Sequence, residues 1–274
     1  MRPTRWPAVS PTLRRRFRLT AALFSIAAVV LALAVTRAFG VRAGGLWFLT
    51  ASPVLCYQLW FLRRWLDRAG SVDTGGVPSG TIGVANAVTL GRGWLYAGVA
   101  GFLFVVPPTG SAWRWLPVAW YGAGAALDWV DGALAKTVGR RSELGSKLDM
   151  AFDTIGFLVA PLVGVAWGRL PIWYLSISAA RYLFKAGRGW RRSRGRPVYD
   201  LPPSRVRRPL AGLQMAFITA ALLPIVPVSV VHPAAAVVVT PSLLVFVRDY
   251  LVVTGRLRTA SSTATDRSEP TPEQ

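Results

Sequence analysis

Four aspartates stand close together in a chain that has only 12 acidic residues among 274. Asp128 and Asp131 are three positions apart, and Asp149 and Asp153 are four apart, so each pair lies on one face of a helix. Clustered carboxylates repel one another where water is scarce, and a bound divalent cation removes that repulsion. Oxygen ligands without His or Cys suit Mg²⁺, Mn²⁺ or Ca²⁺, and four carboxylates are enough for a two-metal site that moves phosphoryl groups.

The elements that must position these aspartates are long apolar helices. The chain is 53% hydrophobic and 16% charged, and its apolar residues form runs long enough to span a membrane. We therefore predict an all-α, polytopic membrane bundle. The expected spans are approximately 19–37, 45–62, 84–107, 114–135, 147–167, 171–186, 210–228 and 233–254. A short loop, 136–146, makes the fourth and fifth spans antiparallel neighbours, so that the four aspartates converge.

The positive charge favours a membrane setting over nucleic-acid binding. The net charge is +20, but the arginines lie in alternate connections between the apolar runs. This is the distribution of cytoplasmic loops in membrane proteins. We expect both termini and the aspartates on the cytoplasmic side of a bacterial inner membrane, with no nucleic-acid partner. Asp249 is expected to pair locally with its neighbour Arg248.

Four parts are expected along the chain. Residues 1–69 hold a basic cytoplasmic segment and two transmembrane helices, and 70–83 form a linker rich in Gly and Pro. Residues 84–254 form a six-helix unit, and 255–274 form a disordered cytoplasmic tail rich in Ser, Thr, Pro and charge. The residues suggest no function for the first two helices.

The segment 128–153, DWVDGALAKTVGRRSELGSKLDMAFD, resembles the signature of the CDP-alcohol phosphatidyltransferase family, D-x2-D-G-x2-A-R-x8-G-x3-D-x3-D. Seven positions match in type and spacing: Asp128, Asp131, Gly132, Ala135, Gly145, Asp149 and Asp153. Lys136 stands where the family has arginine, which keeps the charge but loses the bidentate fork. Upstream, Asn86, Thr89, Leu90 and Arg92 form N-x2-T-L-x-R, which resembles the opening of the first core helix in many members.

The resemblance implies a phospholipid-synthesising enzyme like the phosphatidylglycerophosphate and phosphatidylinositol phosphate synthases. The donor would be CDP-diacylglycerol, the acceptor an alcohol, and the leaving group CMP. Two ions of Mg²⁺ or Mn²⁺ would be held by Asp128, Asp131, Asp149 and Asp153, and Asp153 would also be the general base. CDP would lie against Gly132, Ala135, Lys136, Gly145, Asn86, Thr89 and Arg92. Family members often form homodimers, so a homodimer is one state implied for this chain.

The acceptor is expected to be a phosphorylated polyol, such as glycerol 3-phosphate or inositol phosphate, and serine and another phospholipid are the alternatives left open. Arg181, Lys185 and Arg188 share one end of the sixth span and could bind its phosphate, or could serve only as positive-inside residues. Alternative functions are a catalytically inactive, structural or regulatory family member marked by Lys136, and a cation transporter that uses the aspartates. Ordinary solvated aspartates at helix ends are the alternative to a metal site.

Overall fold

The chain forms a bundle of helices, and no strand occurs in the part that the structure describes. This structure is a computed structural model, which describes residues 11–69, 84–138, 143–202 and 204–257, with only the backbone in 11–13, 65–69, 84–86, 130–138 and 143–147. The α-helices are α1 (Pro11–Phe39), α2 (Val41–Ala69), α3 (Val84–Gly101), α4 (Trp115–Val138), α5 (Glu143–Ala166), α6 (Ser176–Ser193), α7 (Arg207–Leu222) and α8 (Val228–Val253). The expected linker 70–83 and most of the expected tail lie outside the described residues.

Several helices differ from their expected spans: α2 runs from Val41 to Ala69 where 45–62 was expected, and α7 ends at Leu222 where 228 was expected. The reasons are clearest for the third and sixth spans. The span expected over 84–107 ends at Gly101, because the chain then leaves the helix toward Pro107 and Pro108. The span expected over 171–186 divides into a 3-10 turn, Ile172–Leu175, and α6, which continues to Ser193. Its extra length includes Arg188, Arg191 and Arg192 and is not an apolar run, so apolar length alone underestimated this helix.

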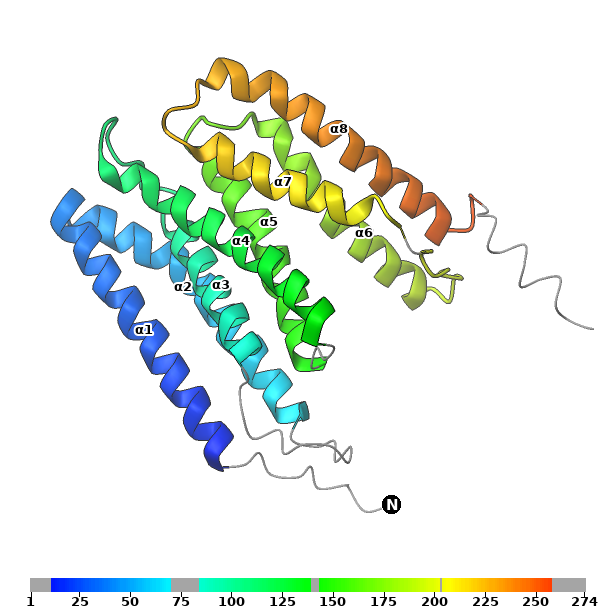
Figure 1. Cartoon of the computed structure of the whole chain (residues 1–274), viewed down its shortest axis with the longest axis horizontal. Coiled ribbons are helices and arrows are strands. Elements are labelled where there is room, and N and C mark those ends of the chain that lie inside the picture. Colours follow the sequence, from blue (N-terminus) through cyan, green and yellow to red (C-terminus); the bar gives the residue numbers. More distant parts are fainter. Residues whose placement is uncertain (1–10, 70–83, 139–142, 203, 258–274) are drawn as a thin grey trace, which may run out of the picture.

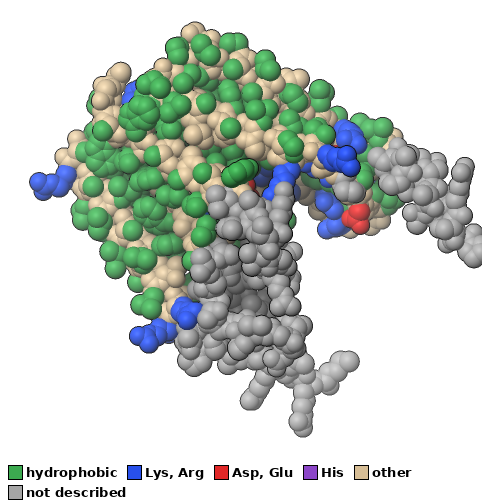
Figure 2. Space-filling model, viewed as in Figure 1, with side chains coloured by type: hydrophobic (Ala, Val, Ile, Leu, Met, Phe, Trp, Pro, Cys, Tyr) green, Lys and Arg blue, Asp and Glu red, His purple; other side chains and the backbone are tan. Residues whose placement is uncertain are grey.

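The surface of the bundle is that of a membrane protein. Within the described residues, four helical segments are long and apolar enough to cross a membrane: Arg14–Phe39, Val41–Arg64, Leu148–Ala166 and Val228–Val253. On α1, Leu19, Leu23, Ile26, Val30 and Leu33 are each more than half exposed. Such an apolar face is costly in water and matches lipid chains. Figure 2 shows hydrophobic side chains over the body of the molecule, with Lys and Arg toward its edges.

Helices α1 and α2 form a tight hairpin. Gly40 alone joins them, with a φ of 90°, a left-handed conformation that glycine adopts without steric cost. Its N–H donates to the carbonyl of Thr36 at 2.8 Å, which ends α1. The hairpin packs against the remaining helices through α2, which contacts α3 and α5.

Helix α3 is the centre of the site-bearing half of the bundle. It packs against α2, α4 and α5, whereas α4 and α5 contact each other only slightly. Figure 1 shows α1 and α8 at opposite flanks, with α3, α4 and α5 between them. Helices α4 and α5 run antiparallel, as expected from the short connection between them. However, α3 lies between them and holds them apart.

The wedge between α4 and α5 is Tyr96 of α3, which is 1% exposed. A Cβ atom built on Gly124 of α4 would lie 2.6 Å from Tyr96 Cε1, and one on Gly156 of α5 would lie 2.8 Å from Cε2. Both distances are shorter than van der Waals contact. The two glycines therefore set the spacing of the three helices that carry the aspartates and Arg92.

Gly156→Ala should consequently destabilise the protein by about 1–3 kcal/mol, because the added methyl group overpacks the Tyr96 ring. Thermal unfolding of the purified protein measures this. Gly91→Ala on α3 is the matched control, since no atom lies within 4 Å of its added Cβ. If Gly156→Ala unfolds at the same temperature as Gly91→Ala, the ring does not set the spacing.

The other half of the bundle contains a partly buried ion pair. Asp249 of α8, 6% exposed, accepts from Arg207 of α7 at 2.6 Å (Nε) and 3.1 Å (Nη2). The expected local pair with Arg248 is wrong, because adjacent helical residues point about 100° apart and cannot face one another. The observed pair joins the start of α7 to the end of α8.

Candidate active site

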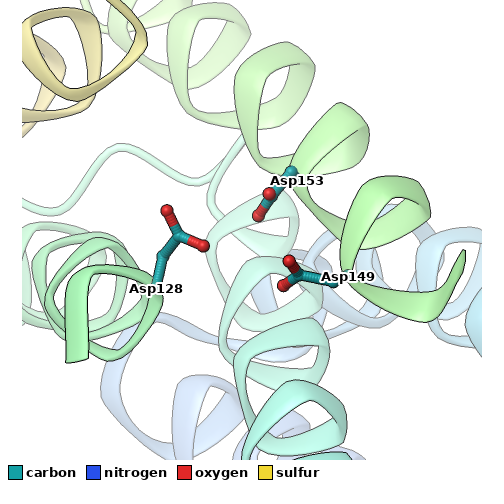
Figure 3. A group of neighbouring side chains, drawn as sticks. All are labelled: Asp128, Asp149 and Asp153. Carbon is teal, nitrogen blue, oxygen red and sulfur yellow. The ribbon is translucent and has the colours of Figure 1, made fainter. Parts of the chain in front are cut away.

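Three carboxylates meet where α4 and α5 approach α3. Asp128 comes from the second half of α4, and Asp149 and Asp153 come from successive turns of α5. One oxygen of each lies within 4.8 Å of the others, and all three side chains are partly buried. Figure 3 shows the carboxylates pointing toward one another from the two helices, with α3 behind them. This group is called the Asp cluster below.

Arg92 of α3 binds the whole Asp cluster. Its Nη1 lies 2.6 Å from Asp149 Oδ1 and 3.2 Å from Asp128 Oδ1, and its Nη2 pairs with Asp153 Oδ1. The arginine is 0% exposed, so its charge depends on these partners rather than on water. The resemblance implied that Arg92 contacts CDP, but not that it joins both aspartate-bearing helices.

The residues of the Asp cluster fit a divalent cation. Their donors are all carboxylate oxygens, which are the ligands that Mg²⁺ and Mn²⁺ prefer. Three carboxylates and one guanidinium carry a net charge of −2 if all are ionised, so a divalent ion would neutralise the group. The oxygens converge within 4.8 Å, so carboxylates from α4 and α5 are close enough to share an ion.

The structure leaves several predicted site residues without a side-chain description. Asp131 lies on α4 one turn after Asp128, and its side chain is outside the described part of the chain. The same holds for Gly132, Ala135, Lys136, Gly145 and Asn86. Thr89 is described; it is buried at 4% exposure on α3, three residues before Arg92.

The three expected acceptor-binding cations divide between two places. Arg181 lines a cavity of about 280 Å³ among α5, α6, α7 and α8. Lys185 instead lines an apolar groove between α2, α5 and α6, where its Nζ donates to Thr154 Oγ1 at 3.2 Å. Arg188 places its guanidinium over the ring of Phe184, 6.0 Å from the centroid. The structure therefore separates Arg181 from Lys185, although both lie on α6.

The cavity beside Arg181 contains a cation that sequence reasoning did not select. Arg207 also lines it, together with Asp249, Gln214 and Ser242. In the sequence Arg207 is one of many arginines between 188 and 208, and it differs from them only in starting an apolar helix. Phe157, which also lines the cavity, lies one helical turn after Asp153 on α5, so the cavity is next to the part of α5 that carries the Asp cluster.

Comparison with known families identifies the class of the protein. The family model described as CDP-alcohol phosphatidyltransferase matches residues 82–265, about two thirds of the chain. The chain belongs to this family. No curated protein and no solved structure matches it.

Family membership establishes the general reaction. The protein is a membrane transferase of phospholipid biosynthesis, and it moves a phosphatidyl group from a CDP-alcohol to an acceptor alcohol. The family generally uses a divalent metal, for which the Asp cluster provides ligands. The match begins at residue 82, so α3–α8 lie within it and the α1–α2 hairpin lies outside it.

Proposed function

We propose that this phosphatidyltransferase uses CDP-diacylglycerol as donor and a phosphorylated polyol, such as glycerol 3-phosphate or inositol phosphate, as acceptor. The observation that carries the proposal is the basic cavity beside the Asp cluster. Arg181 and Arg207 line it with the single carboxylate of Asp249, so its net charge is positive. Asp249 accounts for the charge of Arg207, and a polar alcohol without a phosphate would not require the further arginine, Arg181, in a membrane-embedded cavity.

The Asp cluster is the proposed reaction centre. Asp128, Asp131, Asp149 and Asp153 would hold two ions of Mg²⁺ or Mn²⁺, which supply charge neutralisation to the donor diphosphate. Asp153 would accept the proton of the acceptor hydroxyl as its oxygen forms a bond to the lipid-side phosphorus. The bond from that phosphorus to the CMP oxygen breaks, and CMP leaves with the electron pair. Arg92 was expected to contact CDP; we propose instead that it holds the carboxylates of the Asp cluster in place, because its guanidinium is fully buried against all three of them.

The nucleotide is proposed to lie over the small residues of the signature. Gly132, Ala135 and Gly145 leave room for a base and ribose close to the helix backbone. Lys136, Asn86 and Thr89 are the proposed polar contacts to CDP. Catalysis on the cytoplasmic side of a bacterial inner membrane, and assembly as a homodimer, remain predictions from the arginine distribution and from the family.

The acceptor phosphate is proposed to bind Arg181. Its guanidinium stacks over the ring of Phe157, 4.1 Å from the centroid, and makes no salt bridge with any carboxylate that the structure describes. Arg207, in contrast, is oriented by its two hydrogen bonds to Asp249. A cavity of about 280 Å³ has room for a small phosphorylated polyol, since a water molecule occupies about 30 Å³ of liquid.

Arg181→Ala should raise KM for a phosphorylated acceptor about 10- to 100-fold, as expected for loss of a charge-assisted hydrogen bond. The KM for CDP-diacylglycerol should change little, because Arg181 lies in the acceptor cavity. Arg192→Ala, on the exposed end of the same helix, removes an equal charge and is the control. Unchanged acceptor kinetics in Arg181→Ala would exclude this residue from acceptor binding.

The decisive experiment is CMP release by the purified full chain. CDP-diacylglycerol and Mg²⁺ are supplied with a panel of acceptors: glycerol 3-phosphate, inositol phosphate, serine and phosphatidylglycerol. Release that requires a phosphorylated polyol supports the proposal, and release with serine or a phospholipid overturns its acceptor assignment. No release from folded protein, but release from Lys136→Arg, would indicate an inactive family member.

A further inference from the structure

The α1–α2 hairpin lies outside the family match, yet one of its side chains reaches the helix that carries Arg92. Gln58 of α2 is 2% exposed, although an amide is costly to bury. Its Nε2 donates to the backbone carbonyl of Gly93 on α3 at 2.7 Å. Gly93 directly follows Arg92 in the chain, so this bond is made one residue from the guanidinium that holds the Asp cluster.

Three helices meet at Gly93. A Cβ atom there would lie 2.8 Å from the ring of Phe152 on α5 and 3.1 Å from Gln58 Cδ on α2. Only a glycine allows both side chains to approach α3 so closely. Gly93 directly follows Arg92, and Phe152 directly precedes Asp153. The residues next to this contact in the chain, Arg92 and Asp153, therefore form an ion pair in the site.

Apolar packing surrounds the junction. Leu62 of α2, one turn after Gln58, packs with Leu90 of α3 and with Leu148 and Phe152 of α5, and all four are buried. The hydrogen bond is therefore shielded from water. In such an apolar environment it is stronger than at a surface, so it holds Gln58 and the Gly93 carbonyl together more firmly. Because successive helical residues point about 100° apart, Gln58 and the Asp cluster hold α3 from two different sides.

We infer that Gln58 is a positioning residue for the metal site: it fixes the rotation of α3 about its axis, so that Arg92 and the Asp cluster keep their geometry. This gives the hairpin a role in the reaction that the family core alone does not provide. The inference rests on the proposed metal function of the Asp cluster.

An effect of the Gln58 amide on the metal site can be separated from an effect on the stability of the fold. The carbonyl of Gly93 is inside a helix and can accept the backbone N–H four residues later, so losing Gln58 does not leave it unsatisfied. Methionine has nearly the shape of glutamine, and replacing a buried amide by an apolar group of similar shape can be almost neutral for stability. Gln58→Met should therefore fold while losing the constraint on α3.

The test is Mn²⁺ binding to the full chain, followed by electron paramagnetic resonance in the absence of substrate. Gln58→Met should lower Mn²⁺ affinity about 10-fold, the lower end of the range for groups that orient metal ligands. Thr50→Val is the control, because Thr50 Oγ1 lies 3.2 Å from the carbonyl of Gly101 across the same α2–α3 interface, as well as 2.9 Å from the carbonyl of Leu46 in its own helix. Thr50 lies about 12 Å from Gln58 toward the N-terminus of α2, at about 1.5 Å per residue. Loss of its hydroxyl group should leave Mn²⁺ affinity unchanged.

The possible results separate the inference from the proposed function. Wild-type Mn²⁺ affinity in Gln58→Met overturns the inference while the metal site stands. Equal weakening in Gln58→Met and Thr50→Val also overturns it, since any loosening of the hairpin would then suffice. No Mn²⁺ binding to the wild type removes the metal site itself. If Gln58→Met does not fold, Gln58→Leu replaces it in the same comparison.

Discussion

Asp153→Asn should reduce CMP release about 100- to 10,000-fold, the range that a lost general base covers. The amide keeps the shape of the side chain but cannot accept the proton of the acceptor hydroxyl. It also removes one of the charged oxygens that converge in the Asp cluster, so Mn²⁺ should bind more weakly. The measurement is CMP release at saturating CDP-diacylglycerol and acceptor, with Mn²⁺ affinity measured in parallel.

Asp200→Asn is the appropriate control for this variant. Asp200 is an exposed acid in the connection between α6 and α7, and its neutralisation changes the net charge by the same amount. CMP release by Asp200→Asn should match that of the wild type. A folded Asp153→Asn protein that keeps more than about a tenth of wild-type release would contradict the assignment of the base.

Arg92→Met should destabilise the metal-free protein by about 3–5 kcal/mol, because it leaves three partly buried carboxylates without their common counter-charge. Mg²⁺ should recover much of that loss, since a divalent ion can take the place of the missing positive charge. The measurement is thermal unfolding with and without Mg²⁺. The increase in unfolding temperature caused by Mg²⁺ should be larger in the variant than in the wild type.

Arg207→Met tests whether this response is specific to the Asp cluster. It breaks the pair with Asp249, whose side chain is 8% exposed, and so also leaves a buried carboxylate alone. Its loss of stability should not depend on Mg²⁺, because a single carboxylate rarely holds the ion. If Mg²⁺ stabilises both variants equally, the ion acts elsewhere on the protein and Arg92 is not the counter-charge of a metal site.

The sequence was sufficient to predict that Asp128, Asp149 and Asp153 converge, but not which helix lies between them. Helical spacing placed Asp149 and Asp153 on one face, and a short loop brought that face toward Asp128. Whether two antiparallel helices touch or are separated by a third depends on packing between segments distant in sequence. Tyr96, Gly124 and Gly156 decide it here, and their complementarity becomes visible only when three helices are assembled.

The partners of charged side chains were the least predictable part. Asp249 was expected to pair with Arg248, and it pairs with Arg207 instead, 42 residues away in the chain. Arg181 and Lys185 lie one turn apart on α6 but line different hollows. The helical periodicity of the sequence predicts the face of a helix on which a residue lies. The residue that it contacts on that face depends on how the other helices pack.

The one-residue connection at Gly40 has a consequence for biosynthesis. Because a single residue connects the two helices, the charged side chains that must cross the bilayer at this tip are those of Arg37 and Arg42, and α1 and α2 can enter it together once both have been synthesised. The α2 surface bearing Gln58 and Leu62 would then already be in place when α3 leaves the ribosome. Helix α3 would then pack against an α2 that is already in the membrane. The contact of Gln58 and Leu62 with α3 would be the first available to the residues around Arg92, and it would set their orientation.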